Sequence, residues 1–245
     1  MEINKIYQMD FREFLKQFQD KEIDLLLIDP PYGIDIGSMN FTKSIVGGVA
    51  KRTDYRGHNK EWDKTTLSKE DIDELIRVSK NQIIFGANHF AHLLPASKCW
   101  VVWDKRTAEK YNNDFADCEL IWTSFAKPAR IIRWLWSGML QGDMKNKEKR
   151  VHPTQKPLYV IKKLIEMFSK ETDLIVDCFA GSGTTLLASK ELKRNWIGCE
   201  LQEEYVKITK ERLSQESLFP LAVNKKEDYG LPPTSKEVGI RPTIL

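Results

Sequence analysis

The chain has 245 residues, of which 41% are hydrophobic and 30% charged, and its formal net charge is +3. This length and balance are typical of one globular domain with a sizeable core. No run of about 18 apolar residues occurs, which excludes a membrane span. The start of the chain lacks the basic and apolar regions of a signal peptide, and its four cysteines lack C-x-x-C spacing. We therefore interpret the cysteines as reduced core thiols and expect a cytoplasmic protein.

Positive charge is concentrated in one part of the chain. Residues 127 to 163 hold ten Lys or Arg and two acids, a balance of +8, so the remainder carries about −5. A basic stretch of this kind favours a polyanion as partner. The alternative is a solvated surface loop, but Trp134 and Trp136 lie in the same stretch, and solvated loops seldom need tryptophan.

Strand and helix patterns alternate along the first half of the chain. Asp10 begins a predicted helix, with Glu13 three residues later as a capping box, and Ser68 begins another. The loop 33–63 is long and rich in glycine, so we expect partial disorder without a ligand. The patterns predict a strand at 3–8, the helix from Asp10, a buried strand at 23–28, the helix from Ser68, a strand at 82–85, a short helix at 88–94 and strands at 99–103 and 115–122.

The second half continues this alternation. Pro157 suits the first position of a helix whose buried face extends to Phe168. A strand at 174–178, a helix to Leu192, a strand at 196–199 and a helix at 202–213 follow. The sequence therefore predicts an α/β fold, with a mostly parallel sheet and helices on both faces. We expect one domain at 1–213 and a loosely packed tail at 214–245.

The segment Asp29-Pro30-Pro31-Tyr32 directly follows the buried strand at 23–28. The prolines cannot continue a strand ladder, and open α/β sheets bind ligands just past the carboxyl ends of their strands. The segment offers carboxylate and carbonyl acceptors beside an aromatic ring, which suits a flat ligand with an NH2 group, such as a nucleobase. The alternative is a strand end capped by a proline turn with a packed tyrosine.

A second motif, Phe179-Ala180-Gly181-Ser182-Gly183, links a predicted strand to a helix. Its glycines let a ligand approach the backbone, and Glu200, 19 residues after Gly181, can accept hydrogen bonds from ribose hydroxyls. Leu186 replaces the third glycine of an NAD fingerprint, and Thr follows Gly183 where a P-loop needs Lys. A nucleoside cofactor without phosphate, such as S-adenosylmethionine, fits this pattern best.

Together these motifs resemble those of the amino-methylating DNA methyltransferases, which share an Asp/Asn/Ser-Pro-Pro-Tyr/Phe and a Phe-x-Gly-x-Gly motif. The catalytic motif at 29–32 precedes the cofactor motif at 179–183, as in the permuted, beta-type order, and the segments 152–157 and 195–200 also match. The resemblance covers roughly residues 3 to 213. It implies a Rossmann-like methyltransferase fold with circularly permuted motif order.

The resemblance also implies roles for particular residues. Asp29, Pro30 and Tyr32 would hold the target base. The cofactor would be bound by Asp10 at its adenine, Glu200 at its ribose, Thr154 and Lys156 at its carboxylate, and Asp177, Phe179, Gly181 and Gly183 around its methionine part. Phosphates would be bound by Lys127, Arg130, Arg133, Lys145, Lys147, Lys149 and Arg150. The scattered histidines show no ligand spacing, so no metal is expected.

The implied reaction is transfer of a methyl group from S-adenosylmethionine to N6 of an adenine flipped out of double-stranded DNA. Asp in the first motif position favours adenine, whereas Ser is commoner for cytosine N4, and Asn for RNA or protein amides. The only parts that could recognise sequence are the loop 33–63 and the segment 127–151, so strong sequence specificity is not expected. A noncatalytic nucleic-acid binding module is the alternative outside enzymes. A homodimer and a cognate restriction endonuclease are left open as partners.

Overall fold

The computed structural model describes residues 1–33, 66–106, 116–137, 140–152 and 154–215. The predicted loop 33–63, apart from its first residue, lies outside these residues, as does the predicted tail after residue 215. Residues Met1–Gln215 form one compact unit. Within the described segments, no helix combines the length and apolar character needed to cross a membrane.

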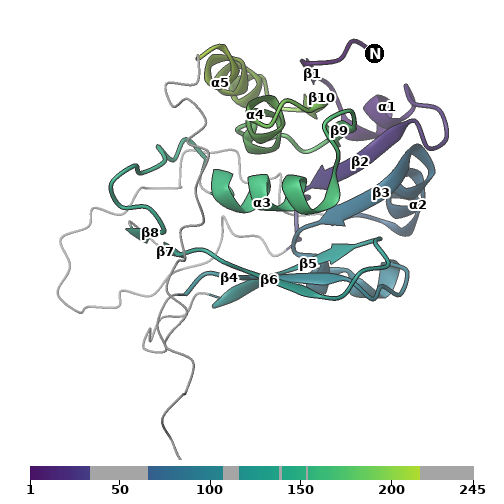
Figure 1. Cartoon of the computed structure of the whole chain (residues 1–245). Coiled ribbons are helices and arrows are strands. Elements are labelled where there is room, and N and C mark those ends of the chain that lie inside the picture. Colours follow the sequence, from purple (N-terminus) through teal and green to yellow (C-terminus); the bar gives the residue numbers. More distant parts are fainter. Residues whose placement is uncertain (34–65, 107–115, 138–139, 153, 216–245) are drawn as a thin grey trace, which may run out of the picture. The chain divides into compact units, whose positions relative to one another are not determined.

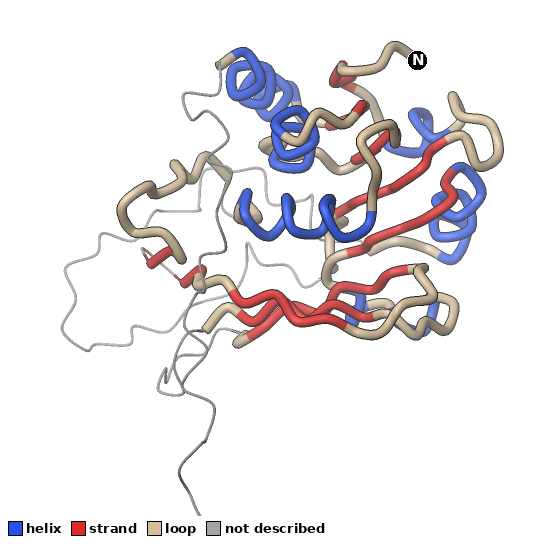
Figure 2. The backbone as a smooth tube through the Cα atoms, viewed as in Figure 1, coloured by secondary structure: helices blue, strands red, loops and turns tan. Residues whose placement is uncertain are grey.

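The unit is built on a sheet of eight described strands, which Figure 2 shows in red from β1 at the top to β6 at the bottom. Their order is β1-β10-β9-β2-β3-β5-β4-β6, and only β5 runs antiparallel to its neighbours, which confirms the mostly parallel sheet. The strands are β1 (Lys5–Gln8), β2 (Ile23–Ile28), β3 (Ser79–Ile84), β4 (Trp100–Asp104), β5 (Cys118–Thr123), β6 (Arg130–Arg133), β9 (Leu174–Asp177) and β10 (Asn195–Glu200); β7 (Trp136–Ser137) and β8 (Leu140–Gln141) pair separately.

Helices cover both faces of this sheet, as predicted. Residues of α1 and α2 share one core cluster, and residues of α3 and α4 share another. Figure 1 shows α3 in front of the central strands. The helices are α1 (Phe11–Leu15), α2 (Lys69–Val78), α3 (Leu158–Phe168), α4 (Thr184–Glu191) and α5 (Glu203–Ser214), with 3₁₀ helices η3 (Ala87–His89) and η4 (Ala91–Leu93).

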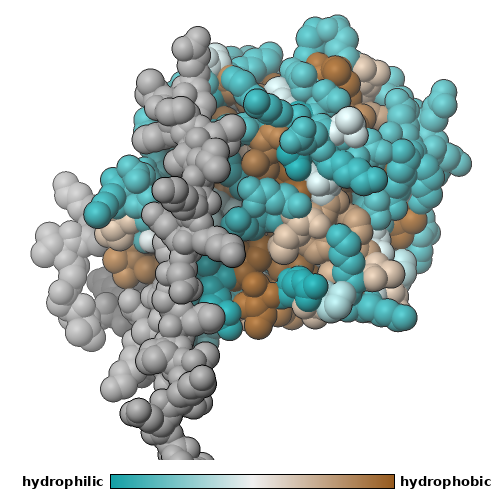
Figure 3. Space-filling view, in the orientation of Figure 1, coloured by the Kyte–Doolittle hydropathy of each residue, from teal (hydrophilic) through white to brown (hydrophobic). Residues whose placement is uncertain are grey.

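The burial of β2 on both faces of the sheet explains why its sequence is almost uniformly apolar. Leu26 and Ile28 pack into the core cluster beneath α1 and α2, whereas Leu25 and Leu27 pack into the cluster beneath α3. A strand buried on both faces reads as a continuous apolar run because successive side chains point to opposite sides. Hydrophilic residues cover most of the face seen in Figure 3, with hydrophobic residues between them near its middle.

Three local predictions differ from the structure. Asp10 does cap α1, but its Oδ1 accepts the amide N–H of Arg12 at 2.8 Å, and Glu13 pairs with Lys16 instead of completing a capping box. The segment 88–94 forms η3 and η4 rather than one short helix, because little chain separates the left-handed Gly86 from Pro95. The basic segment also contains β6, β7 and β8, where no strand was predicted.

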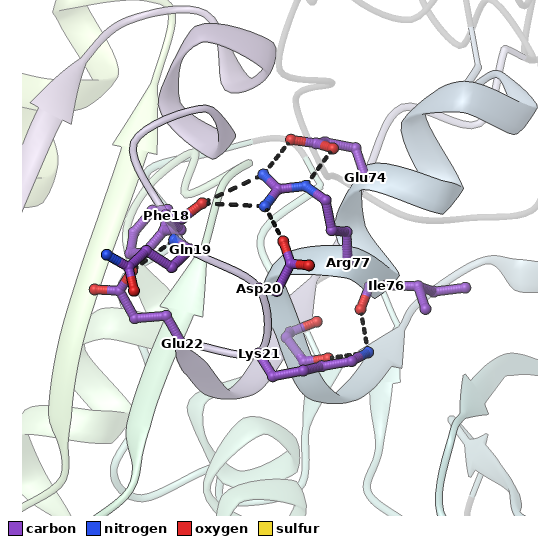
Figure 4. Close-up of polar contacts among 9 residues, drawn as sticks. Phe18, Gln19, Asp20, Lys21, Glu22, Glu74, Ile76 and Arg77 are labelled. Atoms are coloured by element: carbon purple, nitrogen blue, oxygen red, sulfur yellow. Dashed lines mark hydrogen bonds and ion pairs between the residues drawn. The ribbon is translucent and has the colours of Figure 1, made fainter.

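The end of α2 is fastened to the turn between α1 and β2 by Arg77 (Figure 4). Its guanidinium donates to Asp20 and Glu74 at 2.6 Å and to the carbonyl of Phe18 at 3.2 Å. A planar guanidinium can satisfy several oxygens at once. At the other end of α2, Asp71 completes a capping box with Ser68 and accepts two hydrogen bonds from Arg12. These contacts fix the helix pair beside the start of β2.

Candidate active site

The strand order reverses between β2 and β9, which are parallel neighbours in the middle of the sheet. The chain passes from β2 to β3 on one side of this pair and from β9 to β10 on the other. In open α/β sheets, ligands bind in the crevice outside the carboxyl ends of strands at such a switch point. The fold therefore places the candidate site at the ends of β2 and β9.

Four carboxylates lie at the carboxyl ends of four adjacent parallel strands. Asp10 follows β1, Glu200 ends β10, Asp177 ends β9 and Asp29 follows β2. All four line one cavity of about 370 Å³. This volume lies within the range of small-molecule sites. The fold thus gathers acids from both halves of the chain into one cavity.

The cavity brings together most of the predicted site residues. Its walls contain all three residues predicted to hold the base, Asp29, Pro30 and Tyr32. Of the eight residues predicted to bind the cofactor, Gly183 is the one that does not line the cavity. The other seven do: Asp10, Thr154, Lys156, Asp177, Phe179, Gly181 and Glu200.

The two glycines after β9 serve different purposes. Gly181 has a φ of +50°, and a Cβ there would meet only the carbonyl oxygen of Phe179, at 4.0 Å, so the glycine leaves the cavity side open. Gly183 has a φ of +77°, and a Cβ there would stand 2.4 Å from Cγ2 of Thr209 on α5. Gly183 therefore permits close packing of α5, whereas Gly181 lets a ligand approach the backbone.

Glu200 is oriented by two backbone amides. Its Oε2 accepts the N–H of Gly181 at 2.8 Å, and its Oε1 accepts the N–H of Gln202 at 2.9 Å. Burial nevertheless raises the pKa of this carboxyl above its ordinary value. Each carboxylate oxygen can accept more than one hydrogen bond, so both can also accept from a diol. The carboxylate is therefore oriented to accept hydrogen bonds from vicinal hydroxyls.

Asp177 is a buried acid of the cavity with a raised pKa. Burial raises its pKa to about 7, although Thr185 and the N–H of Phe179, at 3.0 Å from Oδ1, favour the ionised form. The nearby carboxylates of Asp29 and Glu200 add repulsion. A cationic ligand in the cavity would counter both burial and repulsion.

Asp29 is held by two side chains. The hydroxyl of Tyr32 donates to its Oδ1 at 2.6 Å, and Nζ of Lys156 lies 2.5 Å from its Oδ2. Nζ of Lys156 is also 3.3 Å from the hydroxyl of Tyr32. Burial raises the pKa of Asp29, and Lys156 opposes that rise. Lys156 thus lies in the cavity, but its ammonium pairs with the residue predicted to hold the base.

Glu119 on β5 is an acid that sequence reasoning missed. Its Oε1 forms an ion pair with Lys105 at 2.6 Å, and its Oε2 lies 3.5 Å from Nζ of Lys156. These two lysines hold the pKa of Glu119 below its ordinary value despite burial. A charged residue inside the apolar pattern of β5 was the available signal, because buried carboxylates are rare without partners.

Tyr32 is fixed by its surroundings as well as by Asp29. Its ring stacks on His89 with centroids 5.0 Å apart and an interplanar angle of 13°. Gly86, with a φ of +61°, packs against the same ring. The 3₁₀ segment after β3 thus positions the aromatic residue of the motif.

The end of the cavity beside Asp10, away from Tyr32, is apolar. The rings of Phe11 and Phe179 pack with centroids 4.7 Å apart, and the guanidinium of Arg12 lies 4.5 Å from the Phe11 centroid. At another wall, the hydroxyl of Thr154 lies 3.1 Å from Nδ1 of His152. The cavity therefore offers an apolar slot with an acid at its edge and a separate polar wall.

The residues predicted to contact phosphates lie on the surface. Arg150 stacks over Trp136 at 4.1 Å, and Lys127 donates to the carbonyl of Met167 at 3.1 Å. Arg133 lies 3.6 Å from Asp104. All seven are exposed: Lys127, Arg130, Arg133, Lys145, Lys147, Lys149 and Arg150. Across the described ranges, no group of three or more His, Cys, Asp or Glu residues could hold a metal ion.

Comparison with known proteins finds similarity to DNA methyltransferases. A family model described as DNA methylase, N6_N4_Mtase, matches residues 102–211. The Type II methyltransferase M1.MboII of Moraxella bovis is 27% identical over 253 residues, covering 84% of this chain and 95% of that protein. The Type II methyltransferase M2.DpnII of Streptococcus pneumoniae is 26% identical, covering 85% of this chain and 88% of that protein.

Solved structures share the fold. The M1.HpyAVI–SAM complex has a TM-score of 0.53 at 23% identity, covering 86% of this chain and 99% of that chain. The cytosine-N4-specific PvuII DNA methyltransferase has a TM-score of 0.58 at 15% identity, covering 88% of each chain. The sheet thus has the Rossmann-like methyltransferase fold, as the sequence predicted.

Within that fold class, the chain is similar to the N6-adenine/N4-cytosine family of amino DNA methyltransferases, through its family-model match and its Type II methyltransferase relatives. The M1.HpyAVI structure was solved with S-adenosylmethionine, the cofactor that the motifs of this chain predict. The roles of individual residues stay predictions, as does the choice between adenine and cytosine.

Proposed function

We propose that this protein transfers a methyl group from S-adenosylmethionine to N6 of an adenine flipped out of duplex DNA. The observation that carries the proposal is the cavity that joins Asp29 to Gly181 and Glu200. Such a cavity can hold a nucleoside cofactor and a target base side by side, which a transfer between them requires. Adenine is favoured because the motif begins with Asp rather than Ser.

The cofactor half of the cavity is assigned from the donors and acceptors it presents. Glu200 would accept the ribose hydroxyls, Asp10 the adenine amine beside the ring of Phe11, and Asp177 would face the positive charge of the methionine part. Gly181 would let the cofactor approach the backbone. Thr154 would bind the carboxylate. Because the ammonium of Lys156 pairs with Asp29, we assign Lys156 to the catalytic half instead.

The catalytic half would hold the target amine. The exocyclic nitrogen of adenine is a weak nucleophile because its lone pair is delocalised into the ring. The carboxylate of Asp29 and the carbonyl of Pro30 would accept its N–H groups, orient the lone pair and stabilise the positive charge that develops on nitrogen. The sulfonium of the bound cofactor supplies an already activated methyl group. Tyr32 would stack on the flipped base, a contact worth on the order of 1–3 kcal/mol.

Duplex DNA is the proposed partner of the basic segment. Its seven cationic residues are exposed, and Arg150 is braced by Trp136. Exposed, preorganised cations suit phosphate contacts, which position a duplex without reading its sequence. These contacts support DNA binding of limited sequence specificity.

The proposal is tested by incubating purified protein with S-adenosylmethionine and DNA in excess EDTA, then digesting the DNA to nucleosides for mass spectrometry. We expect N6-methyladenine, unaffected by the chelator. N4-methylcytosine alone would overturn the adenine assignment but keep the family. Methylation of RNA and not DNA would overturn the substrate class. Tight cofactor binding without any transfer would favour a nucleic-acid binding module.

A further inference from the structure

A row of side chains with alternating charges extends from Lys105, which follows β4, to the cavity. Lys105 pairs with Oε1 of Glu119, Oε2 of Glu119 faces Nζ of Lys156, and Lys156 pairs with Asp29. The side chains of Lys156 and Glu119 are only 9% and 17% exposed. Buried charges persist only when they are paired, so these four groups depend on one another.

Both oxygens of Asp29 are already engaged. Tyr32 donates to Oδ1 at 2.6 Å, and Lys156 donates to Oδ2 at 2.5 Å. A target amine that bonds to Asp29 must therefore share an oxygen with one of them. The ammonium is the stronger competitor, because it carries a charge and the bond to Oδ2 is charge-assisted.

Glu119 offers this ammonium a second place to bind. Its Oε2 is buried and accepts no hydrogen bond from the residues that the structure describes, and it lies 3.5 Å from Nζ of Lys156. A buried acceptor without a hydrogen bond is costly, so a small shift of Lys156 toward Oε2 would be favourable. That same shift would loosen the bond from Lys156 to Oδ2 of Asp29.

We propose that Glu119 is a positioning residue that takes up the ammonium of Lys156 when the target amine binds to Asp29. The inference rests on the proposed function and deepens it. Glu119 is not among the residues that line the cavity, so it acts through Lys156 rather than on the substrate. Lys156 in this scheme is a movable counter-ion, bound to Asp29 before the base arrives and to Glu119 afterwards.

The charges around Asp29 predict how the activity should depend on pH if this scheme holds. Four titratable side chains face Asp29 from different parts of the fold. They are Lys156 in the segment before α3, Glu119 on β5, Asp177 on β9 and Tyr32 in the same loop as Asp29. Glu119 raises the pKa of Asp29 by repulsion, in the same direction as burial, whereas Lys156 lowers it. Removing the charge of Glu119 should therefore lower the pKa of Asp29 and move the acid limb of activity to lower pH.

The test is Glu119→Gln, measured by single-turnover methyl transfer across a pH series. We expect a transfer rate about tenfold lower on the plateau, equivalent to about 1.4 kcal/mol, with the dissociation constant for S-adenosylmethionine within about threefold of the wild type. The acid limb should shift to lower pH. Glu191→Gln is the matched control, because Glu191 is 19% exposed and pairs with Lys162 on α3. The Glu191→Gln variant should change neither the methyl-transfer rate nor the acid limb of the pH–activity profile.

A double-mutant cycle with Lys156→Met separates this role from a structural one. If Glu119 acts through Lys156, Glu119→Gln should cause little further loss in the Lys156→Met background. Additive losses would overturn the proposal, as would a wild-type rate and limb for Glu119→Gln. Retained cofactor binding reports that each variant is folded.

A structure of the wild-type protein with DNA and S-adenosylhomocysteine tests the same point without a mutation. Nζ of Lys156 should lie within hydrogen-bond distance of Oε2 of Glu119, with the target amine on Asp29. If Nζ stays on Asp29 while the amine is bound, the proposal fails. A wild-type protein that methylates DNA while these tests fail would leave the proposed function intact, whereas a wild type without any transfer would overturn the function itself.

Discussion

Gly86 lies so close to Tyr32 that a Cβ at Gly86 would stand 2.1 Å from Cε1 of the tyrosine ring. The φ of Gly86, +61°, also lies in the left-handed region, which glycine tolerates better than other residues. Tyr32 in turn donates to Asp29 and stacks on His89. A backbone position after β3 thus decides where the aromatic residue of the motif after β2 can lie.

The first prediction concerns Gly86→Ala. The added methyl group cannot fit beside the ring, so Tyr32 should move and lose its bond to Asp29. We expect the methyl-transfer rate to fall at least about tenfold with cofactor affinity little changed, since a strained, misplaced group costs about 1–3 kcal/mol. Single-turnover kinetics and calorimetry measure the two quantities. Gly198→Ala, whose Cβ would meet Leu186 instead, should lower thermal stability but not the rate per folded molecule.

The second prediction separates the two halves of the cavity. Asp29→Ala should abolish transfer while leaving cofactor affinity within a few-fold, because Asp29 holds the base. Glu200→Ala should weaken cofactor binding by about 1–3 kcal/mol, the cost of leaving ribose hydroxyls without partners. Titration calorimetry with S-adenosylmethionine measures both variants. Equal losses of cofactor affinity would contradict this division.

The third prediction concerns Asp177 and pH. Its folded-state pKa of about 7 lies above the ordinary 3.8, so the folded protein binds more protons than the unfolded chain between these values. Stability from this group is therefore lost as pH rises from about 4 to about 7, by at most on the order of 4 kcal/mol. Asp177→Asn should raise the melting temperature relative to wild type at about pH 8 and not at about pH 4. The exposed Glu204→Gln is the control, and an equal difference at both pH values would refute the assignment.

The fourth prediction concerns DNA binding. Replacing Lys145, Lys147 and Lys149 with Ala should reduce the slope of log affinity against log salt by about 1 for each true phosphate contact, and weaken all sequences alike. Fluorescence anisotropy over a salt series measures the slope. A control triple variant at Lys69, Lys80 and Lys207, exposed lysines outside residues 127–163, should leave it unchanged. If replacing Lys145, Lys147 and Lys149 left the salt slope unaltered, the basic segment would instead be interpreted as a solvated surface loop.

The sequence predicted the regular parts of the fold because their patterns are local. The apolar run of β2 and the amphipathic face of α3 each report burial directly. The same holds for the site residues at strand ends, since Asp29 follows β2, Glu200 ends β10, and only β9 lies between these two strands. Motif and strand end together were enough to predict one cavity.

What sequence reasoning missed depends on pairs that are far apart in the chain. The approach of Lys156 to Asp29 joins positions 127 residues apart, and nothing local marks it. Glu119 belongs to the antiparallel strand β5, whose place between β3 and β4 the alternating pattern did not reveal. Gly183 was assigned to the ligand together with Gly181 because both belong to the Gly-x-Gly motif, but its contact with Thr209 on a separate helix is not marked in the sequence.

The pairing of β1 with β10 and of β2 with β9 has a consequence for synthesis. Asp10 and Asp29 leave the ribosome early, but their neighbours in the sheet come from the last described strands. Contacts so distant along the chain form slowly, and unpaired strand edges stay open to association until then. Because Glu200, the residue proposed to bind the ribose, ends β10, we expect cofactor binding only after β10 has emerged, and the incomplete sheet is the stage at which the chain would most need a chaperone.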